Sequence, residues 1–186
     1  MPALRTALTT GIVYVRDLLL SAGTGSSRFS PGGIILYDNT AVATDDGTLK
    51  TLISFSLPAG TLANDGDSIE IEALSVLAND TDLKLTAITF GGTVVSTRSG
   101  VADQALRRYE RAVVTRTGAT TQEGFGMTIA TGNGPIYTVS APAETLSGAI
   151  TIALKGQNQT DTTAASVTSI FMRVTYWPIG SSSNLV

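Results

Sequence analysis

Residues 64–73 of this chain, which read Asn-Asp-Gly-Asp-Ser-Ile-Glu-Ile-Glu-Ala, decide its fold class. The first four have the composition of a tight turn, because Asn, Asp and Gly adopt turn conformations readily. Apolar residues at 69, 71 and 73 then alternate with Glu70 and Glu72. An alternation of period two places the apolar side chains on one face of a β-strand and the carboxylates on the other. The stretch therefore predicts a turn that leads into a strand with one buried and one solvated face.

Short β-prone runs and turn clusters alternate in the same way along most of the chain. Strands are expected at residues 34–37, 49–57, 69–73, 83–90, 106–117, 120–131, 136–140, 150–154 and 172–176. Helix signals are weak, and the one stretch of helical composition, Asp103 to Glu110, leads into β-branched residues that favour an extended strand. Roughly eight to ten strands predict an all-β, jelly-roll-like antiparallel β-sandwich.

Two of the expected strands carry irregularities. Within residues 83–90 the apolar positions change parity, which predicts a bulge or burial on both faces. Gly124 and Gly126 interrupt residues 120–131. Glycine inside a strand predicts a kink or the close approach of another backbone.

Residues 22–33 form a Gly- and Ser-rich stretch with one proline, which is typical of a loop or linker. We therefore expect an extended N-terminal arm and linker at residues 1–30, one sandwich domain at residues 31–179 and a flexible tail at residues 180–186. A chain of 186 residues suits a single core of this kind.

The start of the chain lacks the pattern of a secretory signal, because Arg16 and Asp17 directly precede a short apolar run. Nor does any stretch approach the ~18 apolar residues of a membrane-spanning helix. We therefore expect a protein that is made in the cytoplasm, is not exported and has no membrane partner.

The composition excludes several kinds of chemistry. The chain contains no Cys and no His, which removes disulfides, thiolate nucleophiles, imidazole bases and zinc sites built on these ligands. We therefore expect a protein that is not an enzyme and has no cofactor. The net charge of −3 gives no positive field for phosphates, so a nucleic-acid partner is not expected. The cluster of Arg107, Arg108 and Arg111 is interpreted as a solvated strand face or an ion-pair face between subunits.

Two groups of carboxylates are candidate sites. Glu70 and Glu72 lie about 7 Å apart on one strand face, and paired carboxylates support glycoside hydrolysis, but this is the polar face, on which glutamate is common. The turns at 45–47 and 64–67 carry oxygen atoms that could bind Ca²⁺, but neither has the ligand spacing of a dedicated calcium loop. The sequence therefore predicts no catalytic residue and no metal site.

Tyr109, Tyr137 and Trp177 are candidates for ligand or interface contacts. Aromatic rings on strands can form a platform for a sugar, and they also pack in cores and subunit interfaces. Aromatic residues make up only 6% of the chain, which favours packing.

Several short segments, taken together, are typical of one group of proteins. The run Leu57-Pro58-Ala59-Gly60-Thr61-Leu62 precedes the turn and strand at 65–71, and Lys84-Leu85 leads to Phe90-Gly91-Gly92-Thr93. Residues 116–122 (Arg-Thr-Gly-Ala-Thr-Thr-Gln) and 154–158 (Leu-Lys-Gly-Gln-Asn) follow. Together these segments resemble the jelly-roll virion structural proteins of tailed bacteriophages over most of residues 34–178. That group includes capsid decoration (cement) proteins, head fibres and tail-fibre tips, which are commonly homotrimers.

Within this group we expect a capsid decoration protein, because the chain is short, begins at its own Met1 and combines one domain with an arm. The resemblance implies a place on the capsid surface of the virion, with the major capsid protein and further copies of this chain as partners. The residues expected to make these contacts are Arg5, Tyr14, Arg16, Leu18, Leu19, Arg28 and Phe29. The alternative is a receptor- or glycan-binding domain of a head fibre or tail fibre, in which Tyr137 or Trp177 would contact the ligand.

Overall fold

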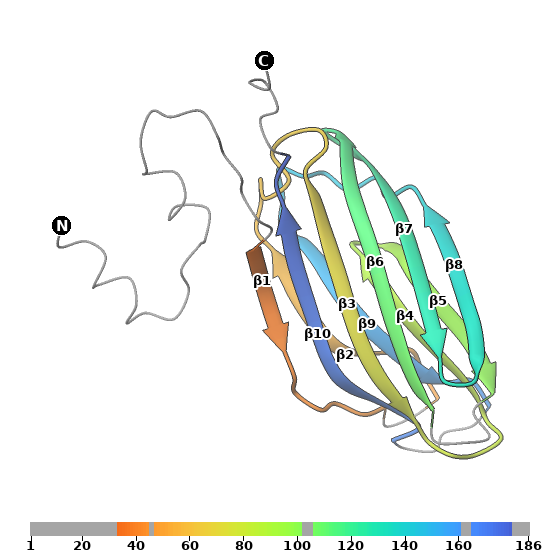
Figure 1. Cartoon of the computed structure of the whole chain (residues 1–186). Coiled ribbons are helices and arrows are strands. Elements are labelled where there is room, and N and C mark those ends of the chain that lie inside the picture. The colour runs from red at the N-terminus through yellow and green to blue at the C-terminus, as the bar shows by residue number, and fades with distance from the viewer. Residues whose placement is uncertain (1–32, 45–46, 102–105, 161–164, 180–186) are drawn as a thin grey trace.

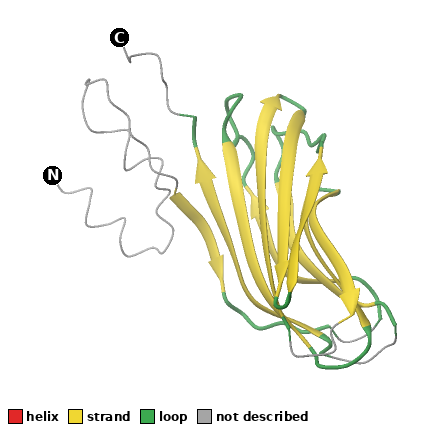
Figure 2. Ribbon diagram, turned by 45° about the vertical axis from the view of Figure 1, so that its right-hand side comes forward, coloured by secondary structure: helices red, strands yellow, loops and turns green. Residues whose placement is uncertain are grey.

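The computed structural model describes residues 33–44, 47–101, 106–160 and 165–179, which form ten β-strands in two facing sheets (Figures 1 and 2). The strands are β1 (Gly33–Asp38), β2 (Lys50–Leu57), β3 (Ser68–Leu77), β4 (Leu83–Phe90), β5 (Thr93–Val101), β6 (Arg107–Gly118), β7 (Thr121–Ala130), β8 (Asn133–Ser140), β9 (Ile150–Asn158) and β10 (Val167–Trp177). The predicted all-β class is confirmed, and β5 is the strand that the sequence pattern missed.

The strand order identifies the sandwich as a jelly roll with one added hairpin. The larger sheet has the order β1-β10-β3-β6-β7-β8 and the smaller one the order β2-β9-β4-β5. When β7 and β8 are set aside, β1-β10-β3-β6 faces β2-β9-β4-β5, which is the strand order of a jelly roll. The β7–β8 hairpin extends the larger sheet at one edge, as the right-hand side of Figure 1 shows.

The core lies between the sheets and is built from alternate residues of the strands. In β3, every second residue from Ile69 to Leu77 is buried, as the sequence alternation predicts. The core includes Ile69, Ile71, Val114 and Val174 of the larger sheet and Ile88, Phe90, Ile152 and Leu154 of the smaller one. Each such side chain contributes roughly 1.5–3 kcal/mol by leaving water.

The parity change in β4 is confirmed, since the pairing with β5 is irregular between Ile88 and Thr89 and the second half of β4 is buried on both faces. In the first half, however, the fully buried residues are Lys84 and Thr86, whereas Leu83 is exposed. This end of the interior is therefore polar.

Arg108 corrects the interpretation of the arginine cluster. Arg107 and Arg111 are exposed, but Arg108 is buried, because consecutive side chains of β6 point to opposite faces. Its guanidinium donates hydrogen bonds to the carbonyl oxygens of Lys84 (3.3 Å) and Arg98 (2.8 Å). Only the two exposed arginines fit the predicted solvated face.

Asp67, which is fully buried, fixes the turn before β3. One carboxylate oxygen accepts a hydrogen bond from the backbone N–H of Asn64 (2.8 Å), and the other accepts one from the N–H of Ile179 (2.8 Å). The carboxylate therefore joins the start of β3 to the segment after β10.

Replacing Asp67 by alanine should lower the free energy of unfolding by about 2 kcal/mol, because two part-buried hydrogen bonds to a fully buried carboxylate would be lost. Chemical denaturation followed by tryptophan fluorescence measures the change. Asp65→Ala is the matched control: Asp65 is exposed and pairs with Arg116, so its loss should cost less than about 1 kcal/mol. Equal effects of the two substitutions would contradict the assigned role of Asp67.

The predicted arm at 1–30 and the predicted tail at 180–186 lie outside the described residues. The first described strand of the sandwich, β1, begins at Gly33. The seven proposed contact residues from Arg5 to Phe29 lie outside the described residues as well. Within the described ranges, no helix has the length and apolar character needed to cross a membrane.

Candidate binding surface on the six-stranded sheet

The outer face of the larger sheet has a charged centre. Arg111 on β6 forms an ion pair with Glu70, and Arg173 on β10 forms one with Glu72 through its Nε (2.6 Å). The hydroxyl of Tyr109 also donates to Glu72. The two carboxylates considered as a hydrolytic pair are thus each bound to an arginine on a neighbouring strand.

These contacts set the charge states at the centre of the face. Burial pushes the pKa of Glu72 upward, but hydrogen bonds from Tyr109 and Arg173 outweigh it, so the pKa lies below its ordinary value. A general acid in glycoside hydrolysis requires the opposite shift. Burial and the hydrogen bond to Glu72 raise the pKa of Tyr109 to about 12.

The three aromatic candidates lie on this face but not together. Tyr109 is half-buried in the charged centre. Trp177, 43% exposed, ends β10 near the opposite edge of the sheet from β8. Tyr137 lies on β8, at the far edge, and is 59% exposed. A single platform of all three rings is therefore not formed.

β7 presents its large apolar residues to the outside. Phe125, Met127 and Ile129 lie on the outer face, while Gly124, Gly126 and Thr128 are buried on the inner face. The cause is the close approach of β5: a Cβ atom on Gly126 would overlap the carbonyl oxygen of Val95. The predicted close backbone approach is confirmed at Gly126, whereas a Cβ atom on Gly124 would meet side-chain atoms of Ser140 and Val95.

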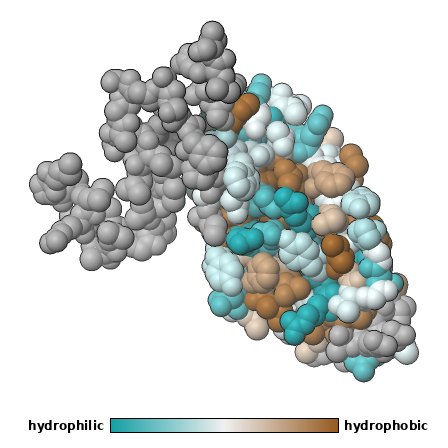
Figure 3. Space-filling model, viewed as in Figure 1, coloured by the Kyte–Doolittle hydropathy of each residue, from teal (hydrophilic) through white to brown (hydrophobic). Residues whose placement is uncertain are grey.

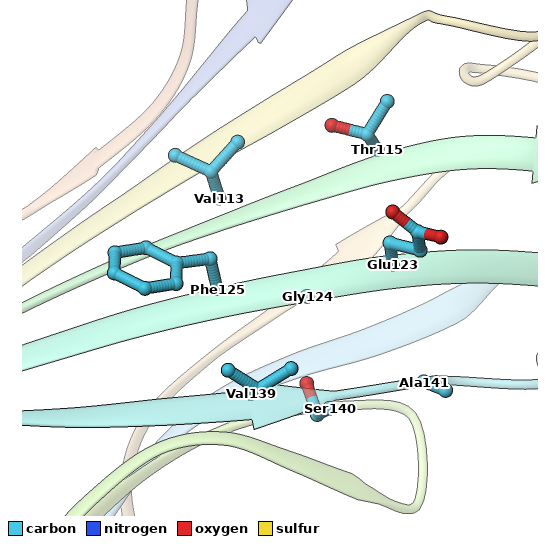
Figure 4. A pocket seen from close by; sticks show the side chains of 8 residues that line it. All are labelled: Val113, Thr115, Glu123, Gly124, Phe125, Val139, Ser140 and Ala141. Carbon is cyan, nitrogen blue, oxygen red and sulfur yellow. The ribbon is translucent and has the colours of Figure 1, made fainter.

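An open depression of about 720 Å³ lies on the outer face of β6, β7 and β8 (Figure 4). Its lining consists of Val113, Thr115, Glu123, Gly124, Phe125, Val139, Ser140 and Ala141. The close-up separates an apolar side, with Val113, Phe125 and Val139, from a polar side with Thr115 and Glu123. Figure 3 views the same sheet face and shows hydrophobic residues interspersed with hydrophilic ones.

Phe125, on the apolar side of this depression, stacks on Tyr137, which lies beside the lining residues. Their ring centroids are 5.8 Å apart with an interplanar angle of 28°. Both rings remain more than half exposed, and Val139, which lies opposite Phe125 in the strand pairing, is 84% exposed. Neither Glu123 nor Thr115 makes a side-chain hydrogen bond or ion pair to any residue in the described part of the chain. The depression thus joins the exposed ring of Phe125, with Tyr137 stacked on it, to free polar groups.

Of the residues that form this surface, the sequence singled out Tyr137 alone. Phe125 was missed because an alternation of large residues with glycine is read by default as a strand with its large side chains in the core. The available signal was the pair Gly124 and Gly126, which indicates a close neighbour on the glycine side and therefore an outward-facing Phe125.

The candidate calcium turns gain no support. Both carboxylate oxygens of Asp67 accept backbone N–H groups, and residues 45 and 46 lie outside the described part. Among the residues that the structure describes, no three acidic side chains come together in a group that could hold a metal ion.

Comparison with known proteins gives no family assignment: no protein-family model matches the sequence, and no curated protein matches it. Similar solved structures include VP2 of infectious bursal disease virus in a subviral particle, with 18% identity and a TM-score of 0.34 over 74% of this chain and 30% of that one. Another is the CBM2 module of the evolved Dit of Lactobacillus casei BL23 phage J-1, with 9% identity and a TM-score of 0.33 over 78% and 79%.

A third similar structure is a protein of unknown function from Shewanella oneidensis MR-1, with 8% identity and a TM-score of 0.36 over 89% of this chain and 94% of that one. Two of the three thus come from a virus and a phage. All three TM-scores lie below 0.5, so these likenesses carry no argument about the function of this chain.

Proposed function

We propose that this chain is a structural protein of a virion, and specifically a capsid decoration (cement) protein of a tailed bacteriophage. The sequence segments that resemble such proteins fall on the strands and turns of the jelly roll, including the turn fixed by Asp67. Jelly rolls are frequent in viral capsid proteins, although the fold also occurs in lectins and enzymes and does not define function by itself.

The observation that carries the proposal is the position of the two ends of the described domain. Gly33, the first residue of β1, pairs with Tyr176 near the end of β10. The preceding 32 residues and the seven that follow Ile179 therefore join the sandwich at one end of one sheet, as Figure 1 shows. A domain that is joined in this way can be held at one end while the rest of the sandwich projects.

Exposed apolar residues lie at the same end. Trp177 is 43% exposed and Ile179 is 52% exposed. Together with the arm residues from Arg5 to Phe29, they would contact the major capsid protein and neighbouring copies in a homotrimer. The role is passive, because burial of apolar area between subunits stabilises the shell without catalysis, cofactor or nucleic acid.

Deleting residues 1–21 should abolish binding to the capsid while leaving the sandwich folded. Purified full-length and truncated chains are added to particles that lack the protein, and the bound fraction is measured after sedimentation. The unfolding midpoint of the truncated chain is the control for folding and should match that of the full chain. Retained binding by the truncated chain would rule out the arm as the clamp.

Cryo-electron microscopy of the intact particle tests the location itself. Density for a β-sandwich repeated over the capsid lattice is the expected result. Density confined to the tail or to a single vertex would instead assign the chain to the receptor-binding proteins.

A further inference from the structure

We propose that the outer face of β7 and β8 carries a carbohydrate-binding site, in which Phe125 and Tyr137 stack on a sugar ring and Glu123 and Thr115 bind its hydroxyl groups. This site is independent of the capsid contact proposed above. It lies across the sheet from β1 and β10, whose ends carry the proposed contact.

The first support is the topology. β7 and β8 are not needed to complete the jelly roll, because the other eight strands already form both sheets in jelly-roll order. The added hairpin nevertheless exposes Phe125, Ile129, Tyr137 and Val139 on one face. A large apolar patch on the surface of a soluble domain commonly marks an interaction site.

The size of the patch indicates a small ligand. If a whole aromatic side chain presents roughly 200 Å², the exposed fractions of Phe125, Ile129, Tyr137 and Val139 sum to on the order of 400 Å². A standard protein interface buries about 800 Å² on each partner. The patch is therefore too small to hold a second copy or another protein by itself, but it covers one or two sugar rings.

The chemistry of the depression matches a sugar. A pyranose has a face of C–H groups, which packs on an aromatic ring, and a rim of hydroxyl groups, which require hydrogen-bond partners. Phe125 and Tyr137 supply the ring surface, while Glu123 lies two residues from Phe125 on the same strand, about 7 Å away. Figure 4 shows the side chains of Phe125, Glu123 and Thr115 on the same side of the sheet.

The polar side also determines which ligands fit. A free carboxylate accepts strong, charge-assisted hydrogen bonds from hydroxyl groups. The same carboxylate repels phosphates, and the chain has a net charge of −3, so a nucleic acid is disfavoured. The site therefore suits a neutral or amino sugar.

The chain supplies a matched control on the opposite edge of the same sheet. Tyr37 on β1 is 60% exposed and stacks on Phe171 with centroids 6.1 Å apart, much as Tyr137 stacks on Phe125. The difference is the surroundings, because Glu123 and Thr115 line the same depression as Phe125, whereas neither Tyr37 nor Phe171 lines it. Tyr37→Ala thus removes an equivalent ring from outside the proposed site.

The test begins with the full-length chain on a glycan array, followed by calorimetric titration of the sugars that bind. Tyr137→Ala and Phe125→Ala should each weaken binding by about tenfold, and Glu123→Ala by about fivefold. Tyr137→Phe keeps the ring and should stay within about twofold of the unmodified chain. Tyr37→Ala should leave the affinity unchanged, and the unfolding midpoint of each variant checks that it is folded.

Three results would overturn the proposal: no glycan bound by the full-length chain, equal losses in Tyr37→Ala and Tyr137→Ala, or a change of oligomeric state in Tyr137→Ala during sedimentation. The last would identify the patch as a contact between copies. Capsid binding by Tyr137→Ala is measured in parallel and should be retained, which separates failure of this site from failure of the capsid proposal.

Discussion

Replacing Gly126 by alanine should lower the free energy of unfolding by about 3 kcal/mol or more, which for a domain of this size can prevent folding. A Cβ atom at this position would overlap the carbonyl oxygen of Val95 and lie 2.9 Å from the Cα of Ser96. Both are backbone atoms of β5, in the opposite sheet, so no side-chain rotation relieves the overlap. The sheets would have to separate at this edge.

Gly134→Ala is the matched control for this substitution. Gly134 lies on the neighbouring strand β8, and a Cβ atom there would meet no other atom within 4 Å. Its unfolding midpoint in guanidinium chloride should stay close to that of the unmodified chain, while that of Gly126→Ala drops or soluble protein is lost. An unchanged midpoint for Gly126→Ala would refute the close packing of β5 against β7.

Replacing Glu110 by glutamine should remove a pH dependence of stability. Burial raises the pKa of Glu110 from 4.5 to about 7, and the opposing hydrogen bond from Thr86 and the charge of Arg108 reverse only part of this shift. One carboxylate oxygen of Glu110, like the Nε of Arg108, is buried without a hydrogen-bond partner among the described residues. The ionised form is therefore poorly solvated in the interior.

The direction of the effect follows from proton binding. Between pH 4.5 and about 7 the folded chain holds a proton on Glu110 that the unfolded chain has released. The stability that this group contributes is therefore full below pH 4.5 and is lost as the pH rises through about 7. The difference between the two pKa values corresponds to about 3 kcal/mol.

Urea denaturation at pH 4.5 and pH 8 measures this difference. Glu110→Gln should be more stable than the unmodified chain at pH 8, by up to about 3 kcal/mol, and similar to it at pH 4.5. Glu123→Gln serves as the control, because Glu123 is exposed and its loss should leave the pH dependence in place. If Glu110→Gln showed the same pH dependence as the unmodified chain, another group would have to be responsible.

The strands of the jelly roll were largely predictable from the sequence. In β3, Ile69 and Ile71 alternate with Glu70 and Glu72, and this local pattern alone assigns the strand and its buried face. The turn at residues 64–67 was equally clear, because its residue types favour turns in any context. Such signals depend only on residues that are close together in the chain, so they can be recognised without the tertiary structure.

The polar interior was not predictable in the same way. Lys84 and Arg108 are fully buried, although charged residues in strands are ordinarily placed on the solvated face. Lys84 pairs with Asp80, which lies four residues earlier in the loop before β4. Arg108, in the larger sheet, donates to the carbonyl oxygens of Lys84 and Arg98 in the smaller sheet. The acceptors of Arg108 are brought to it only because the two sheets face each other.

The candidate binding surface, too, could be predicted from the sequence only in part. By itself, the sequence determined an all-β sandwich, a chain without Cys or His, and Tyr137 as an aromatic candidate. Only the tertiary structure decided that Phe125 faces outward beside Tyr137, because this depends on how closely β5 packs against Gly126. Residue periodicity reports that a strand has two different faces, but the opposing sheet determines which of those faces has room for large side chains.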